Sequence, residues 1–219
     1  MIENYLAEVS SYAGDIDGLI TLITVIVFFW FFLAQAVLFT LVFKYRAKDG
    51  VKAKYITGEL KSEKKWITIP HFMVLVFDVI ILVFAIRVWV HVKQTLPEPD
   101  AIVEITGQQW AWSFNHPGAD GELGTDDDIA TVDELHVEVN KNYHFVLGAE
   151  DVIHSFSVPV FRLKQDAIPG REITGWFNAE QTGTYDIQCA EMCGIGHGVM
   201  FGRIIVETAE EHARWVASN

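Results

Sequence analysis

Two cysteines lie four residues apart near the C-terminus, and they are the only cysteines in the chain. Cys189 and Cys193 are followed by His197 and Met200, so two thiols, an imidazole and a thioether fall within twelve residues. Copper centres select such soft sulfur and nitrogen ligands over the oxygen ligands that harder ions prefer. Glycines at positions 194, 196 and 198 make the segment compact. The spacing therefore predicts a metal-binding loop.

Several chemistries remain open for this loop. Two lone cysteines outside the cytoplasm form a disulfide by default. Zinc also accepts Cys and His, although a thioether is an unusual zinc ligand. A single blue copper needs two histidines, one cysteine and a weak methionine, which leaves one cysteine over. Two copper ions bridged by two thiolates would use every residue, and His154, in a turn farther upstream, is a weaker candidate for a further ligand.

The N-terminal part of the chain predicts a membrane anchor. Residues 19–43 carry no charge and exceed the roughly 20 residues that cross a bilayer as a helix. A second apolar run, residues 66–92, predicts a second span. It contains Asp78, which is costly in a membrane and needs a partner such as Gln35 of the first helix or another subunit; a soluble helix is the other interpretation.

The loop between the two apolar runs predicts their orientation. Residues 44–65 hold eight Lys and Arg against three acids, an excess typical of the cytoplasmic side. The tail of residues 1–18 holds acids but no Lys or Arg, so both termini are expected on the other side. Its acidic start and long apolar run do not fit a cleavable signal peptide. We expect a bacterial plasma membrane with the C-terminal part on the periplasmic side; a mitochondrial inner membrane is the alternative.

Residues 93–207 predict an all-β domain, and residues 208–219 predict a short helix that opens with a capping-box spacing from Thr208 to Glu211. Eight β-like runs are separated by turn residues, at a spacing typical of a sandwich or barrel. These runs are residues 102–105, 110–114, 135–139, 143–147, 155–158, 172–177, 184–188 and 201–206.

The C-terminal part is strongly acidic. From residue 94 onward it has 21 Asp and Glu against 6 Lys and Arg, a net charge of −15 where the whole chain has −13. Such a surface repels nucleic acid and speeds the encounter with cationic partners. Solubility alone is the other explanation. The acidic run of residues 118–128 lacks EF-hand ligand spacing, so we interpret it as an exposed loop that is either a docking surface or a weak cation site.

Five segments together resemble subunit II of the haem-copper cytochrome c oxidases, over nearly the full length of the chain. They are WITIP at 66–70, GQQWAWS at 107–113, EDVIHS at 150–155, LKQDAIPGR at 163–171 and QCAEMCG at 188–194, followed by His197 and Met200. The resemblance implies a two-helix transmembrane hairpin followed by a cupredoxin-like Greek-key domain. It further implies a subunit of a proton-pumping enzyme, not catalytic on its own, that accepts electrons from an extracytoplasmic donor and passes them to haem in subunit I for the reduction of oxygen to water.

The cofactor that the resemblance implies is a binuclear copper A centre. Cys189 and Cys193 would bridge the two copper ions, and His154 and His197 would each bind one of them. Met200 would be a weak axial ligand.

Further residues receive roles from the same resemblance. The backbone carbonyl of Glu191 would be the other axial copper ligand, while its side chain would bind a magnesium ion shared with subunit I. Trp110 would be the site where electrons arrive, although strand alternation alone would place it in the core, where we leave Trp112. Glu63 would stand at the entrance of a proton path; a solvated loop glutamate is the alternative.

The expected partners are subunit I with its haems and copper B, subunit III, and cytochrome c or another donor. Acids that could dock a basic cytochrome c are Asp126, Asp127, Asp128, Glu150, Asp151 and Glu180. Asp166 and Arg171 match a segment at the haem-side interface, and a surface ion pair is the alternative. Two other classes stay in view: a quinol oxidase subunit, which lacks copper A, and a membrane-tethered copper carrier or sensor.

Overall fold

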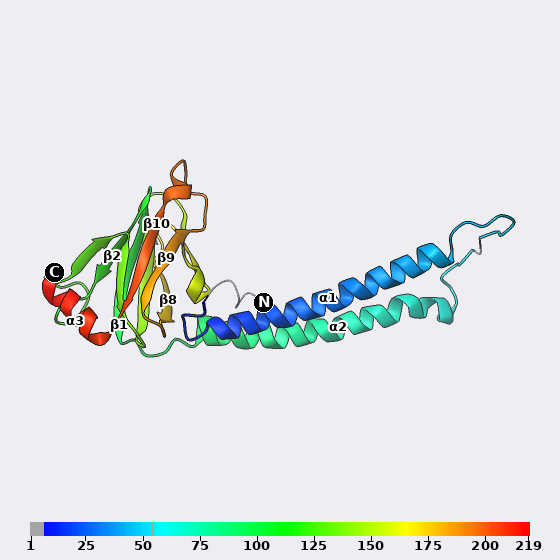
Figure 1. The fold of residues 1–219 in the computed structure, drawn as a ribbon, viewed down its shortest axis with the longest axis horizontal. Coiled ribbons are helices and arrows are strands. Elements are labelled where there is room, and N and C mark those ends of the chain that lie inside the picture. Colours follow the sequence, from blue (N-terminus) through cyan, green and yellow to red (C-terminus); the bar gives the residue numbers. More distant parts are fainter. Residues whose placement is uncertain (1–6, 54) are drawn as a thin grey trace. The chain divides into compact units, whose positions relative to one another are not determined.

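The computed structural model of the chain describes residues 7–53 and 55–219 and divides into two units. One unit is Gly18–Val90, and the other combines Met1–Asp17 with His91–Asn219. Figure 1 labels the elements of both units.

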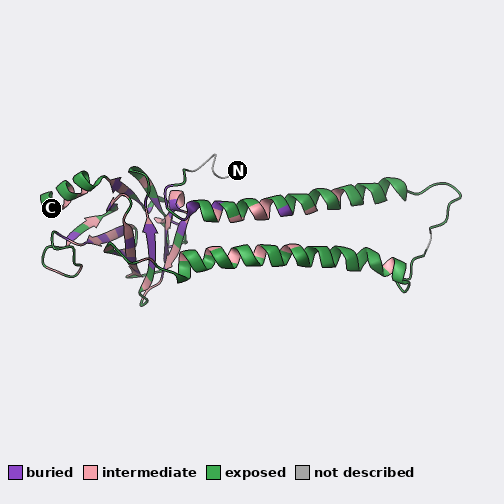
Figure 2. Ribbon diagram, turned by 90° about the horizontal axis from the view of Figure 1, so that it is seen from below, coloured by how far each residue is buried: buried purple, intermediate pink, exposed green. Residues whose placement is uncertain are grey.

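Two long helices account for the first unit. Helix α1 runs from Ala13–Lys44, α2 from Lys61–Trp89, and a π-helical turn at Val90–Gln94 continues α2. Both helices are long and apolar enough to cross a membrane, with mean hydropathies of 2.5 and 2.6. Nearly all of their side chains are exposed (Figure 2). Because a helix that is apolar all round needs an apolar environment, these two helices suggest insertion into a membrane.

Aromatic side chains join the two helices to each other. The ring of Phe77 in α2 lies 5.8 Å from that of Trp30 and 6.1 Å from that of Phe29, both in α1. Further along α2, Ile81, Ala85 and Val88 recur at helical spacing and are half-buried. These positions define the seam between the helices.

The described residues 101–207 form ten strands in two five-stranded sheets. The first sheet has the order β3-β2-β1-β5-β8, and the second has the order β4-β10-β9-β6-β7. The bounds are β1 Ala101–Gln108, β2 Ala111–His116, β3 Ile129–Val132, β4 Glu134–Glu138, β5 Asn142–Ala149, β6 His154–Val158, β7 Leu163–Ala167, β8 Ile173–Asn178, β9 Gly183–Cys189 and β10 Phe201–Glu207. Strands β3 and β7 lie outside the runs that the sequence predicted.

Strand pairing is mixed in both sheets. β1 pairs in parallel with β5, and β4 in parallel with β10, while the remaining pairs are antiparallel. Parallel neighbours cannot be joined by a hairpin, so the chain must cross between the sheets. The outcome is the predicted all-β domain after two apolar helices.

The core lies between the two sheets. Strand β2 alternates buried and half-buried residues, with Trp112 and Phe114 on the inner face. Phe145 of β5 and Phe156 of β6 reach the same core and are fully buried. The alternation follows the two-residue period of a strand with one buried face.

The segment before α1 joins the β domain rather than forming a free tail. Val9 and Tyr12 are fully buried, and Ser10 forms a β-bridge with Ala179. Full burial of a side chain the size of Val contributes about 1.5–3 kcal/mol. At the start of α1, Asp17 accepts two hydrogen bonds from the Arg162 guanidinium, at 2.6 and 2.8 Å, and both side chains are buried. This pairing ties the first turns of α1 to the β domain.

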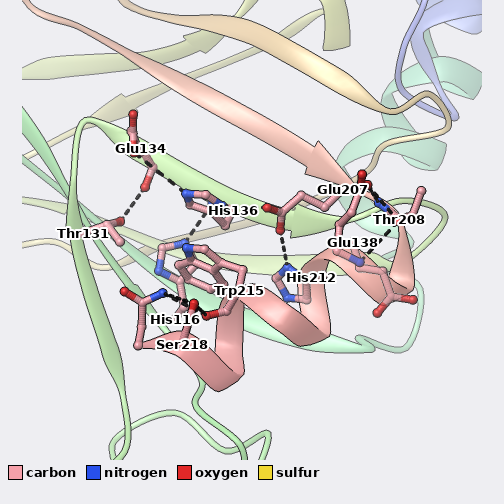
Figure 3. A network of polar contacts seen from close by, with 12 residues as sticks. His116, Thr131, Glu134, His136, Glu138, Glu207, Thr208, His212, Trp215 and Ser218 are labelled. Carbon is pink, nitrogen blue, oxygen red and sulfur yellow. Dashed lines mark hydrogen bonds and ion pairs between the residues drawn. The ribbon is translucent and has the colours of Figure 1, made fainter.

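Helix α3, Ala209–Ser218, packs on the β domain through aromatic rings (Figure 3). Its predicted capping box is confirmed, because the Thr208 side chain accepts from the Glu211 amide and the Glu211 carboxylate accepts from the Thr208 amide. The indole of Trp215 stacks on the His136 ring, with 4.2 Å between centroids and 8° between planes. Glu207 accepts from His136 and from His212 through its two oxygens, at 3.1 and 2.9 Å.

Candidate metal centre

Adjacent strands bring the predicted ligands to one end of the second sheet. His154 begins β6, Cys189 ends β9, and the two strands pair through Phe156 and Cys189. The loop that follows β9 returns to β10, and the Cys189 amide donates to the Met200 carbonyl at 3.2 Å, closing the loop at its base. The amide of Ala190 donates to the Ser155 carbonyl at 2.9 Å. Ligands that are far apart in sequence are therefore held by backbone pairing.

The two cysteines are free thiols whose sulfur atoms face each other at 3.8 Å. Among the described residues, one group of at least three His, Cys, Asp or Glu has its ligand atoms within 4.8 Å of one another: His154, Cys189 and Cys193. The structure therefore holds the thiols as a pair of possible ligands and not as the disulfide that was one alternative.

Each of the two histidines lies beside a different cysteine sulfur. His154 Nδ1 is 4.0 Å from Cys189 Sγ, and His197 Nδ1 is 3.7 Å from Cys193 Sγ. Met200 Sδ lies 3.8 Å from Cys193 Sγ and 3.2 Å from His154 Nδ1. The backbone oxygen of Glu191 lies 3.3 Å from Cys189 Sγ. The atoms of all six predicted ligands thus meet around the sulfur pair.

Four of the six predicted ligand residues are closed to solvent. His154 is fully buried, and Cys189, Cys193 and Met200 expose at most 9% of their surface, while His197 is half-buried and Glu191 is exposed. Burial, with the hydrogen bond and charge of Cys189 adding to it, raises the pKa of the Cys193 thiol to about 11. At neutral pH this thiol therefore keeps its proton until a metal displaces it, since metals bind the thiolate.

A carboxylate that the sequence did not single out for this purpose orients His154. His154 Nε2 lies 2.9 Å from Asp151 Oδ1, which leaves Nδ1 directed at the sulfur pair. Asp151 also accepts from the backbone amides of Gln109 and Val152. Burial acts to raise the pKa of Asp151, but these hydrogen bonds outweigh it and hold the pKa below its usual value. An ionised partner of this kind fixes the tautomer and the ring orientation of a metal ligand.

Trp110 lies against the loop that carries the thiols. It sits in the turn between β1 and β2, is 41% exposed, and donates from its indole nitrogen to the Cys193 carbonyl at 3.3 Å. The Gln109 side chain donates to the same carbonyl at 2.7 Å. A Cβ on Gly196 would lie 2.3 Å from the indole, so only glycine allows this close approach. Trp112, in contrast, is fully buried in the core, as predicted.

The donor set fits a soft copper centre better than the alternatives. A thioether is an unusual zinc ligand, and a single blue copper leaves one thiol without a role. Two thiols with an imidazole on each side, a thioether and a carbonyl match a pair of copper ions bridged by sulfur.

Comparison with known proteins supplies the family. Residues 101–209 match the family described as cytochrome c oxidase subunit II, periplasmic domain. The alternative cytochrome c oxidase subunit 2 of Bradyrhizobium diazoefficiens is 34% identical over 197 residues, which cover 80% of this chain and 69% of that protein. The chain belongs to the cytochrome c oxidase subunit II family. It is accordingly a subunit of a haem-copper oxidase, and membership implies a copper A centre.

Further relatives agree with this assignment. The cytochrome c oxidase subunit 2 of Thermostichus vulcanus is 46% identical over 121 residues, covering 55% of this chain and 34% of that protein. The crystal structure of the periplasmic domain of subunit II of Bradyrhizobium japonicum cytochrome oxidase is 35% identical, with a TM-score of 0.50, and covers 57% of this chain and 96% of that structure. The β domain of this subunit II therefore has the cupredoxin-like fold.

The other predicted site residues are Glu191, Glu63, Asp166 and Arg171. The Glu191 carboxylate is exposed and lies 3.3 Å from the Met192 amide, while its carbonyl points at sulfur. Glu63 is in the first turn of α2, where it accepts from the Gly58 amide at 3.0 Å. The suggested ion pair between Asp166 and Arg171 does not form in the described part of the chain. Asp166 instead accepts from Ser155 at 2.8 Å and from Lys164 at 3.0 Å.

Some acids of the loop at residues 118–128 accept hydrogen bonds from the loop itself and from β2. Asp127 accepts from the Thr125 hydroxyl, and Asp128 accepts from the Gly124 amide and the Asn115 side chain. The remaining docking candidates, Glu150 and Glu180, are exposed. Asp151 was predicted only as a docking acid, and its contact with His154 could have been suspected from their spacing of three residues.

Proposed function

We propose that this subunit II is the electron-accepting subunit of a proton-pumping cytochrome c oxidase, and that its C-terminal domain holds a binuclear copper A centre. The proposal rests on one observation above all. Two thiols face each other at 3.8 Å with a histidine nitrogen beside each sulfur. This arrangement offers each of two metal ions one histidine and a share of both thiols.

Six residues would hold the two copper ions. Cys189 and Cys193 would be shared by both ions, His154 and His197 would each hold one, and Met200 would be a weaker ligand. The Glu191 carbonyl would be the other weak ligand, while the carboxylate on the opposite side of that residue would hold a magnesium ion shared with subunit I. Its exposure and the direction of the carbonyl support the two separate roles.

When bound, copper A supplies one-electron chemistry, taking electrons from an extracytoplasmic donor such as cytochrome c and giving them to haem in subunit I. The protein contributes a rigid and dry shell. Backbone pairing fixes the loop, Asp151 fixes the His154 ring, and burial keeps water out. A shell that moves little between oxidation states suits electron transfer, whereas a copper carrier needs exposed ligands that exchange.

Trp110 is the proposed residue at which the electron enters the protein. Its indole is partly exposed and also hydrogen-bonded to the Cys193 carbonyl, so it connects the surface to a copper ligand. Acidic residues of the domain attract a cationic donor, in keeping with the net charge of this part of the chain.

The membrane part has a separate proposed task. Both termini and the copper domain lie on the periplasmic side of a bacterial plasma membrane, with the basic loop in the cytoplasm. Glu63, in the first turn of α2, then lies near the cytoplasmic face, where it passes protons toward subunit I. Subunit III completes the set of proposed partners.

Replacement of Trp110 tests electron uptake. In the complete oxidase, Trp110→Leu is expected to slow copper reduction by reduced cytochrome c at least about tenfold, or 1.4 kcal/mol of barrier. Stopped-flow absorbance measures the rate, and the copper spectrum checks that the centre is intact. Trp215→Phe, in α3, is the matched control and is expected to change nothing. An unaltered rate of copper reduction in Trp110→Leu, with an intact copper spectrum, would rule out electron entry at Trp110.

A further inference from the structure

Gly107, near the end of β1, stands where the strand pattern calls for a large apolar side chain. β1 turns Val103 and Ile105 into the core, where both are fully buried, and Gly107 is the next residue on the same face. A glycine in a strand weakens it and often marks the close approach of another group. The φ of Gly107 lies outside the left-handed region, so its backbone conformation does not require glycine. The reason for glycine must be the space beside it.

The ring of His154 occupies that space. A Cβ at Gly107 would lie 3.0 Å from Cδ2 and 3.1 Å from Cγ of His154, and 3.1 Å from Cζ3 of Trp112. Carbon atoms in favourable contact lie about 3.5–4.0 Å apart. Trp112 is the cross-strand partner of Gly107, and its ring lies 6.0 Å from that of His154, at 65° between planes. All three residues are buried, so neither ring can give way into solvent.

The other contacts of His154 leave its ring little freedom. Its Nε2 lies 2.9 Å from Asp151, and its Nδ1 lies 4.0 Å from Cys189 Sγ. A ring pushed away from β1 must therefore change the distance between Nδ1 and the sulfur pair or lengthen the contact with Asp151. The three atoms nearest to a Cβ at Gly107 belong to His154 and Trp112, so the crowding acts on one of the two proposed histidine ligands.

We propose that Gly107 is a positioning residue of the copper site. Because it has no side chain, the His154 ring can lie against the β1 backbone, and this contact sets the distance from Nδ1 to the sulfur of Cys189. A methyl group at this position would displace His154 and leave His197 in place, which makes the two metal positions unequal. The inference deepens the proposed function and rests on it, since it concerns the same six residues.

The contact itself can be measured without copper and without a substitution. In the copper-free, detergent-solubilised chain, labelled in glycine and histidine, we expect a strong nuclear Overhauser effect between an Hα of Gly107 and Hδ2 of His154. The two groups are close enough for it, because the Cβ direction of Gly107 points at Cδ2. This result does not depend on how many copper ions the site holds. Absence of the effect between the assigned signals would overturn the proposal.

The substitution Gly107→Ala tests the consequence for the metal. We expect the hyperfine couplings of the two copper nuclei to become unequal and the copper affinity to fall about tenfold, as for other residues that orient metal ligands. Gly148→Ala is the matched control. Gly148 lies on the neighbouring strand, beside Thr106, and the nearest atom to its Cβ would be the Arg171 carbonyl oxygen at 3.9 Å. The control is expected to keep the affinity and the spectrum.

Equal hyperfine couplings with unchanged affinity in Gly107→Ala would contradict the positioning role. A single-copper spectrum in the unmodified protein would instead contradict the proposed function, and the affinity and the Overhauser effect would then decide on Gly107.

A double variant tests whether crowding is the cause. Trp112→Phe replaces the indole with a smaller ring, which gives the new methyl group and His154 room. We expect Gly107→Ala combined with Trp112→Phe to return toward equal hyperfine couplings, while Trp112→Phe alone keeps them equal. Electron-spin resonance and competition with a copper chelator measure all three variants. A double variant no closer to the unmodified protein than Gly107→Ala would show that crowding of His154 is not the cause.

Discussion

Cys193 is the residue on which the proposed copper site depends most. Its sulfur lies within 3.8 Å of Cys189 Sγ, His197 Nδ1 and Met200 Sδ, and its carbonyl accepts from the Trp110 indole. A single side chain therefore contacts three proposed ligands, and its backbone contacts the proposed electron-uptake surface. Because the Cys193 thiol is buried, water cannot replace a contact that a substitution at this position removes.

The substitution Cys193→Ser is expected to abolish the binuclear centre while leaving the β domain folded. A serine hydroxyl has nearly the shape of a thiol but is a hard and weak ligand for copper, so at most one ion would remain. Copper content and electron-spin resonance of the oxidase measure the result. Met192→Leu, an exposed change in the same loop, is expected to keep the shared-electron signal. Two bound ions with that signal in Cys193→Ser would refute the bridging role.

At the scale of residues, the sequence was sufficient to propose the ligands but not to predict the residues that support them. The loop from Cys189 to Met200 is continuous, so its soft ligands can be recognised from spacing alone. The Gln109 side chain, in contrast, contacts a carbonyl 84 residues away, and the glycine at position 196 is required by a ring in another turn. Such contacts exist only once the sheets have paired.

At the scale of elements, the paired strands determine where the proposed ligands lie. The alternation of apolar residues predicted eight strands and the capping box predicted α3. Strand β3 is short and follows an acidic loop, and β7 reads LKQDA, so neither has an alternating apolar pattern. Each is formed by pairing with a neighbour: β3 with β2, and β7 with β6. The burial of Val9 and Tyr12 against the β domain was missed for the same reason, because local sequence does not encode a distant partner.

We expect the histidine cluster under α3 to make the stability of the domain depend on pH. His116 is buried, its Nδ1 is 3.1 Å from the Ile129 carbonyl, and its Nε2 accepts from the His136 amide at 3.1 Å. Burial lowers the pKa of His116 to about 4. The groups that face this cluster are His136, His212, Glu134, Glu207 and Trp215 (Figure 3).

We expect the free energy of unfolding to fall as the pH decreases from about 6.5 to about 4, by up to about 3 kcal/mol from His116. Between these values the unfolded chain binds a proton that the folded His116 does not, so acid favours unfolding. Urea unfolding of the detergent-solubilised chain, followed by tryptophan fluorescence, measures the slope. His116→Gln should flatten it, and His144→Gln, in a half-buried histidine outside the cluster, should not. An equal slope in His116→Gln and the unmodified protein would show that His116 is not the source.

At the scale of the whole molecule, the chain combines two apolar helices with a β domain, and these two parts suit different surroundings. The anchor is two apolar helices joined by a basic loop, and the domain is a β sandwich with a net negative charge. Composition alone separated these two parts, because a membrane and water demand different surfaces. Composition could not show that the residues before α1 belong to the β domain.

Glu63 tests whether the anchor also serves proton uptake. Glu63→Ala is expected to slow oxygen consumption by the assembled oxidase a few-fold, because a carboxylate that relays protons is lost, while copper reduction by the donor stays unchanged. Oxygen-electrode turnover and stopped-flow reduction measure the two steps. Glu59→Ala, an exposed acid of the same loop, is the control and should leave both steps intact. Equal slowing of both steps by Glu63→Ala would contradict a role in the proton path.

We infer that the loop from Cys189 to Met200, with His154, holds two copper ions that share an electron. Electron-spin resonance of the copper-loaded protein is the decisive measurement. We expect hyperfine structure from one unpaired electron shared equally by two copper nuclei, with two copper ions per chain by metal analysis. Hyperfine structure from a single copper nucleus would contradict it and would favour a mononuclear copper site or a carrier.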